Sequence, residues 1–245
     1  MTALRVLALA AAIATAGLPV TAQELTLDLG DGPLLSTRTV QLMLLITVVS
    51  LAPGLAVTVT CFPFVITVLS ILRQGLGLQQ SPPNMLLVSL ALFLTWFVME
   101  PVFLESWRLG IEPLNRGEMD AAEAMVAATG PFRLFMAARL DPDTFEALSA
   151  LRGSVPQIAM SDAPLSVLVP AFMLSELSRA LEIGFMIFLP FLVIDLVVAA
   201  VLMAMGMMMV PPAIVSLPFK LAFFVAADGW TLVATALVRG YAGGP

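Results

Sequence analysis

Five methionines gather in one stretch of twelve residues, VLMAMGMMMVPP, at residues 201–212. Thioether sulfur binds Cu(I), so a membrane copper site is one interpretation. In a helix, however, only pairs such as Met203 and Met207 share a face. Unbranched methionines also suit a constriction lined by flexible, apolar side chains. The two prolines at 211–212 are expected to end the helix. Together with Gly206 they favour irregular backbone, which at membrane depth lies inside protein or along a cavity, and this favours the constriction over lipid-facing packing.

Three ionisable residues stand out in the apolar parts of the chain: Glu176, Asp195 and Lys220. Asp195 lies within a long apolar run, where a carboxylate must be protonated or paired. One interpretation pairs it with Lys220, the only lysine, across a helical hairpin. In the alternative, Lys220 extends to the lipid headgroups and Asp195 contacts another subunit. A proton relay in a transporter using Asp195 and Lys220 is a further alternative, but the membrane segments offer few other polar steps, so a structural or assembly contact is favoured.

The residues that are absent exclude several kinds of chemistry. The chain has no histidine and a single cysteine, Cys61. Catalysis of the Ser-His-Asp or Cys-His type lacks its base, an internal disulfide cannot form, and a thiolate or imidazole metal site is nearly excluded. The net charge of −6 argues against nucleic acid. These absences exclude histidine- and cysteine-based catalysis; that the chain is no enzyme and carries no cofactor or metal is what the family resemblance described below implies.

The composition assigns the chain to membrane proteins. Of the 245 residues, 60% are hydrophobic and 11% are charged, whereas a soluble domain has about a quarter charged residues. No water-soluble fold of this length can bury so much apolar surface. Because the apolar runs are long, the sequence predicts an all-α membrane protein with two hydrophobic helical hairpins flanking an extracytoplasmic helical insert.

Residues 1–22 have the pattern of a cleaved signal peptide. Arg5 precedes an apolar run, and Val20 and Ala22 occupy the positions that signal peptidase reads. The alternative is a first transmembrane anchor, because the apolar run is only slightly shorter than a span needs. Cleavage would make Gln23 the first residue, outside the cytoplasmic membrane of a bacterium.

Residues 23–104 are predicted to form a lead-in and the first hydrophobic hairpin. The uncharged run at 42–72 is too long for one straight helix, and Pro53-Gly54 is expected to split it. A membrane helix then ends near Arg73, and the sequence GLGLQQSPPN forms a turn. The second helix of the hairpin occupies residues 85–104.

Residues 105–182 hold most of the charge, and their apolar positions have the spacing of amphipathic helices, so this segment is the predicted insert. Residues 183–245 form the second hairpin, with the methionine-rich loop between its helices. The short loops carry Arg73 and Lys220 and no acid, which places them in the cytoplasm and the insert in the periplasm.

Five stretches together resemble the FliP family, the export-gate proteins of flagellar type III secretion. They are LRQGLGLQQSPPN, ALFLTWFVMEPV, PAFMLSELSRALEIGF, PFLVIDLVVAAVLMAMGMMMVPP and LPFKLAFFVAADGW. The resemblance implies a homopentamer that joins FliQ and FliR in the flagellar basal body of the inner membrane. There it contacts other export-apparatus membrane proteins and the basal-body ring, and unfolded flagellar proteins pass through the pore.

The resemblance also assigns site residues. It implies a pore gasket made by Gly206, Met207, Met208 and Met209. It implies ionic contacts at Glu176, Asp195 and Lys220. Its members commonly read T-S-F-T-R where this chain has Thr60-Cys61-Phe62-Pro63-Phe64, so Phe64 replaces an expected basic residue.

Overall fold

A computed structural model describes residues 33–78, 81–152, 159–207 and 209–242. The chain divides into two compact units, Met1–Ser50 and Leu51–Pro245, and all sites considered below lie in the second. The predicted signal peptide, residues 1–22, lies outside the described residues, so its cleavage stays a prediction. The described residues form helices and contain no β-strand, which confirms the predicted all-α class.

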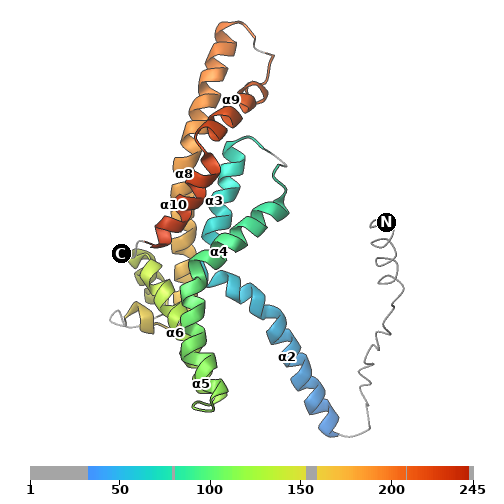
Figure 1. Cartoon of the computed structure of the whole chain (residues 1–245), viewed down its shortest axis with the longest axis vertical. Coiled ribbons are helices and arrows are strands. Elements are labelled where there is room, and N and C mark those ends of the chain that lie inside the picture. Colours follow the sequence, from blue (N-terminus) through green and yellow to red (C-terminus); the bar gives the residue numbers. More distant parts are fainter. Residues whose placement is uncertain (1–32, 79–80, 153–158, 208, 243–245) are drawn as a thin grey trace, which may run out of the picture. The chain divides into compact units, whose positions relative to one another are not determined.

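Figure 1 shows the helices in chain order. Their bounds are α2 Pro33–Thr58, α3 Phe62–Gly75, α4 Asn84–Ser106, the π-helix η1 Trp107–Ile111, α5 Glu112–Asn115, α6 Ala121–Arg139, α7 Pro142–Leu151, the short 3-10 helix η2 Met160–Asp162, α8 Leu165–Ala204, α9 Pro212–Ala226 and α10 Gly229–Ala242.

The break expected at Pro53-Gly54 falls instead between α2 and α3. Helix α2 includes both residues and ends at Thr58. The Thr60 hydroxyl then donates to the Val57 carbonyl at 2.9 Å, which satisfies a free acceptor at the helix end. Pro63 stands in the first turn of α3, where a missing N–H leaves no hydrogen bond unmade. The local hydrogen bonding therefore places the break, and the proline at 53 does not.

Helix α3 is a core helix rather than the predicted membrane span. Its 14 residues reach about 21 Å, which is shorter than the roughly 30 Å of hydrocarbon in a bilayer. Phe64, Val68 and Leu72 are each 1% exposed or less, and α3 packs on α8 and α4. At Gly184 of α8 a Cβ would stand 2.3 Å from the side chain of Ile71, so glycine permits this close approach.

Helix α8 runs unbroken for 40 residues, through Pro170 and Pro190. It crosses the predicted boundary between residues 182 and 183, so the insert and the second hairpin share one helix. Its first part packs on α6 and α7 around a second apolar core that includes Met136 and Phe172. The change at 182–183 is therefore one of composition, while the backbone continues.

Two helical stretches within the described residues are long and apolar enough to cross a membrane. They are Asn84–Asn115 and Leu165–Ala204. Helices α9 and α10 add a third candidate if the pair is one span, bent by 62°. Asp228, at a φ of 48°, makes the bend together with Gly229, whose missing side chain admits the Phe224 ring.

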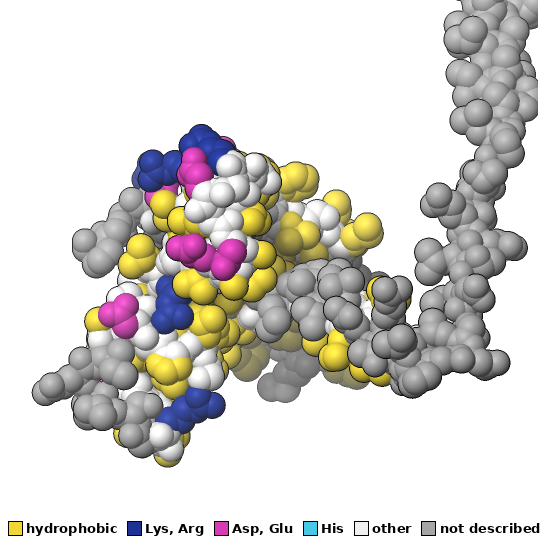
Figure 2. All heavy atoms as spheres, turned by 90° about the horizontal axis from the view of Figure 1, so that it is seen from below, with side chains coloured by type: hydrophobic (Ala, Val, Ile, Leu, Met, Phe, Trp, Pro, Cys, Tyr) yellow, Lys and Arg dark blue, Asp and Glu magenta, His cyan; other side chains and the backbone are white. Residues whose placement is uncertain are grey.

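Many of the charged side chains of the insert lie on its surface, whereas Glu176 is buried. Figure 2 shows acidic and basic side chains interspersed with apolar ones on the face seen from below. Glu105 pairs with Arg108, and Glu112 pairs with Arg116, in exposed contacts along η1 and α5. Such exposed pairs contribute little stability.

Candidate functional site: a methionine loop and two paired carboxylates

The loop that joins α8 to α9, residues 205–211, is called the methionine loop here. Gly206 takes a left-handed φ of 72°. Its N–H donates to the Met203 carbonyl at 3.0 Å, and the Met207 N–H donates to the Leu202 carbonyl at 2.9 Å. This glycine-capped pattern is a Schellman motif, which closes a helix. Gly206 therefore ends α8, and Pro211-Pro212, expected from the sequence to end that helix, instead starts α9.

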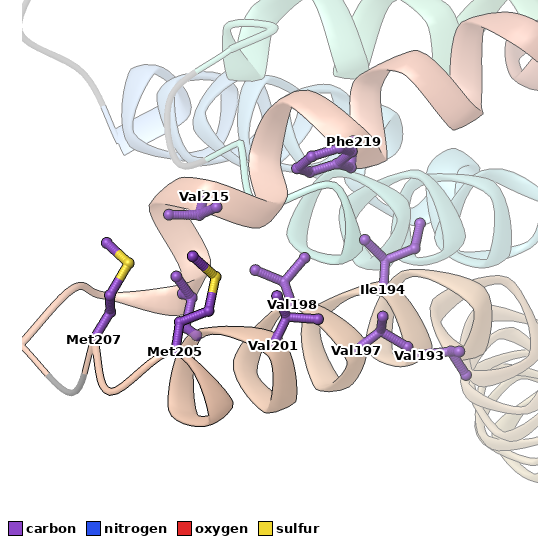
Figure 3. A pocket seen from close by; sticks show the side chains of 10 residues that line it. Val193, Ile194, Val197, Val198, Val201, Met205, Met207, Val215 and Phe219 are labelled. Carbon is purple, nitrogen blue, oxygen red and sulfur yellow. The ribbon is translucent and has the colours of Figure 1, made fainter.

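The methionines of the loop have different surroundings. Met209 is 98% exposed, while Met207 is 41% exposed. Met208 lies outside the described residues. Figure 3 shows the side chains of Met205 and Met207 on the side of the loop that faces α9, the helix that carries Val215 and Phe219. The loop therefore presents one methionine freely and turns others toward its own hairpin.

An apolar groove of about 590 Å³ lies between α8 and α9, beside the methionine loop. Its lining residues are aliphatic, aromatic or methionine: Val193, Ile194, Val197, Val198, Val201, Leu202, Met205, Met207, Val215 and Phe219. It offers no polar group to orient a small substrate. Nowhere in the described residues do three or more His, Cys, Asp or Glu side chains cluster as metal ligands. The lining of the groove is therefore suited to apolar contact.

Asp195 and Lys220 form an ion pair across the α8–α9 hairpin, the first of the two interpretations above. The Lys220 Nζ donates to Asp195 Oδ2 at 2.6 Å and to the Gly75 carbonyl at 3.0 Å. The Ser216 hydroxyl donates to the other oxygen, Asp195 Oδ1, at 2.5 Å. Because Gly75 ends α3, the ammonium also faces the negative end of that helix. The Lys220 side chain is 6% exposed and that of Asp195 is 34% exposed, so one buried cation joins three helices.

Glu176 is fully buried, and its carboxylate is paired on both oxygens. Arg139 Nε, at the end of α6, donates to Oε1 at 3.1 Å, and Arg179 Nη1 lies 3.6 Å from the same oxygen. The Tyr241 hydroxyl donates to Oε2. A buried charge is tolerated only when it is paired and hydrogen-bonded, and here α6, α8 and α10 together supply the partners.

Aromatic rings complete the surroundings of Glu176. The Tyr241 ring contacts Phe64 edge-on at 5.4 Å between centroids and stacks on Phe135 at 6.0 Å. The Arg139 guanidinium lies 4.0 Å from the Tyr241 ring centroid, as a cation–π pair. Phe64, at the position where the family commonly has a base, is thus buried beside the Glu176 cluster, and the cations of that cluster come from α6 and α8.

Sequence reasoning missed five partners: Gly75, Arg139, Arg179, Ser216 and Tyr241. Four of them lie far along the chain from the carboxylate or lysine that they contact, and no spacing rule links them. Arg179 is different, because it lies three residues after Glu176 on one helix, a spacing that places the two side chains on the same face. Tyr241 offers only the weak signal that it is the single tyrosine of the chain. The functional roles of Glu176, Asp195, Lys220 and the loop residues stay predictions.

Comparison with known proteins gives the family. The FliP family profile matches residues 45–237. A flagellar biosynthetic protein FliP of Caulobacter vibrioides is 51% identical over 240 residues, which cover 96% of this chain and 90% of the relative. Proteins of the same name from Bacillus subtilis and Aquifex aeolicus are 45% and 37% identical, over 84% and 98% of this chain and 93% and 98% of the respective relatives. The chain therefore belongs to the FliP family of flagellar biosynthetic proteins.

Proposed function

We propose that the chain is a core channel subunit of the flagellar type III protein export gate. With its partner subunits it forms the pore through which unfolded flagellar proteins leave the cell during flagellum assembly. Family membership supports this role, and the apolar, loop-tipped second hairpin suits a channel wall better than an active site. The subunit acts as structure and has no catalytic step.

The observation that carries the proposal is the apolar surface of α8. Forty residues of helix extend about 60 Å, which is twice the roughly 30 Å of hydrocarbon in a bilayer. Large exposed apolar side chains occur along this whole length, from Leu165 through Leu189 to Met203. Lipid tails can cover about half of that length, so other protein chains must cover the rest. A subunit built for a multimer meets this requirement.

The methionine loop is the proposed gasket of the pore, formed by Gly206, Met207, Met208 and Met209. Several copies around one axis would multiply the few thioethers of each chain into a ring. The 98% exposure of Met209 supports this role, because nothing in the described part of its own chain covers that side chain. Methionine changes rotamer at little cost, so a ring can close on itself and yield to a passing polypeptide. Its apolar surface favours dewetting, which blocks ions.

The assembly consists of a homo-oligomer, with five copies as the proposed number, together with FliQ and FliR. Other export-apparatus membrane proteins and the basal-body ring surround it. The chain is a multi-pass protein of the inner membrane, with the insert on the periplasmic side. Removal of residues 1–22 is part of this topology, and N-terminal sequencing of assembled protein should then begin at Gln23.

Native mass spectrometry combined with negative-stain microscopy tests the proposal. The tagged chain, purified from its own membranes, should give a ring-like multimer that contains small helical partner proteins. A monomer that transports protons in vesicles would instead indicate the transporter, and a monomer that retains Cu(I) would indicate the copper protein.

A further inference from the structure

The last turn of α10 is fixed by contacts that its own sequence does not explain. The final carbonyls of a helix lack partners within the helix, and glycine near a helix end favours fraying. Here, however, the Gly240 carbonyl accepts a hydrogen bond from Arg139 Nη1 at 2.7 Å. The next side chain, Tyr241, is partly buried and lies among rings from two other helices. The turn is therefore held from outside α10.

Among the residues that the structure describes, one guanidinium makes the polar contacts that hold this turn to α6. Arg139 donates through Nε to Glu176, donates through Nη1 to Gly240, and lies over the Tyr241 ring at 4.0 Å. These contacts use the planar fork and the flat face that distinguish arginine from lysine. Glu176 keeps the arrangement closed, because a fully buried carboxylate is costly to leave without its cation and its hydroxyl donor.

We propose that Arg139 is the positioning residue of a C-terminal lock, formed by Arg139, Glu176, Gly240 and Tyr241, which binds the end of α10 to the insert. The lock makes the insert, the first part of α8 and the end of α10 move as one body. The described residues of the methionine loop, at the other end of α8, make no such contacts. If the chain is a gate subunit, as proposed above, the lock is the fixed point against which the loop moves.

The single tyrosine makes the lock directly observable. Fluorotyrosine incorporated into the full chain reports Tyr241 alone, because the chain has no other tyrosine. In detergent, the ¹⁹F chemical shift of the parent should differ from that of free fluorotyrosine. A soluble gadolinium chelate should enhance the relaxation of this resonance only weakly, because the Tyr241 ring is partly buried. Arg139→Met removes two charge-assisted hydrogen bonds, which should raise the open population at least about tenfold and move the resonance toward the free position.

Arg133→Met is the matched control. Arg133 also lies on α6, is also partly buried, and donates to two backbone carbonyls, those of Ser161 and Ala163. Its loss should loosen the insert without moving the Tyr241 resonance. If Arg133→Met moves the resonance as far as Arg139→Met does, the effect is general loosening and the lock is wrong.

A double variant separates positioning from folding. Glu176→Gln in the Arg139→Met background removes the buried carboxylate that has lost its nearest cation, so thermal stability should recover in part while the Tyr241 resonance stays in the released position. A resonance that keeps its parent position and shielding in both Arg139 variants overturns the proposal. The fluorine measurement needs neither partner proteins nor export, so a negative result would not contradict the proposed gate function. Conversely, failure to find a ring-like multimer would not contradict the lock.

Discussion

The two ends of α8 differ in how far contacts within the single chain bury and pair their side chains. Near the start of the helix, Glu176 is 0% exposed and both of its oxygens have partners within the chain. After its last turn, Met209 is 98% exposed beside an apolar groove. Asp195 lies between them in sequence and also in burial, with 34% of its side chain exposed.

This difference indicates which part of the helix makes its contacts when the single chain folds and which part makes them when subunits assemble. A buried carboxylate without its cation is costly, so the Glu176 end must be complete in the single chain. Exposed methionines cost little by comparison, and they can be covered later by other copies or by substrate. We therefore expect substitutions to affect stability most at the Glu176 end and least at the methionine loop.

The largest loss of stability is expected for Arg139→Met. It leaves a fully buried carboxylate without its nearest cation, which typically costs about 3–5 kcal/mol. Thermal unfolding in detergent, followed by circular dichroism, measures the loss. A change no larger than that of the exposed control Arg108→Met would remove the contrast between the two ends of α8.

Phe64→Arg sharpens the same contrast. Alone it should destabilise, because it adds a buried charge and removes the edge-on contact with Tyr241. In the Arg139→Met background it should restore part of the lost stability, because a cation returns beside Glu176. The same unfolding assay on the parent, the two single variants and the double variant gives the coupling free energy between positions 64 and 139. Additive losses would show that a base at position 64 does not pair with Glu176.

A smaller loss is expected for Lys220→Met, about 1–3 kcal/mol, because the partly exposed Asp195 keeps its bond from Ser216. Asp195→Asn keeps the shape and removes the charge. It should lower the yield of multimer in native mass spectrometry if the ion pair serves assembly. Normal assembly with loss of export alone would instead assign Asp195 to gating or a proton relay.

A small loss, outside both ends of α8, is expected for Asp141→Ala at the start of α7. Hydrogen bonds from the Thr144 side chain and backbone lower the pKa of the Asp141 carboxyl below its usual range. Its stabilising contribution is therefore complete above the ordinary pKa of aspartate and is lost as the pH falls through the lowered value. Parent and variant melting temperatures should differ at neutral pH and converge in acid, and a constant difference would contradict this.

The sequence predicted the helical class, the apolar elements and the residues of the loop, because these follow from composition and local patterns. It misplaced the end of α8, since one glycine in a left-handed turn ends a helix more effectively than the prolines that follow it. It also assigned α3 to the membrane, because an apolar helix buried in protein and one facing lipid have the same composition. Two partners of Glu176, Arg139 and Tyr241, could not be predicted, since they meet the carboxylate only through the packing of three helices.

Ion conductance across planar bilayers that contain the purified assembly tests the central claim most directly. Substituting alanine for Met207, Met208 and Met209 together should leave assembly near normal and make the bilayer leak small ions. Leucine at the same three positions should keep the seal and slow export, because leucine has a similar volume and a stiffer side chain. If the triple alanine variant assembles and stays as ion-tight as the parent, the methionines are packing and the loop is not the gasket.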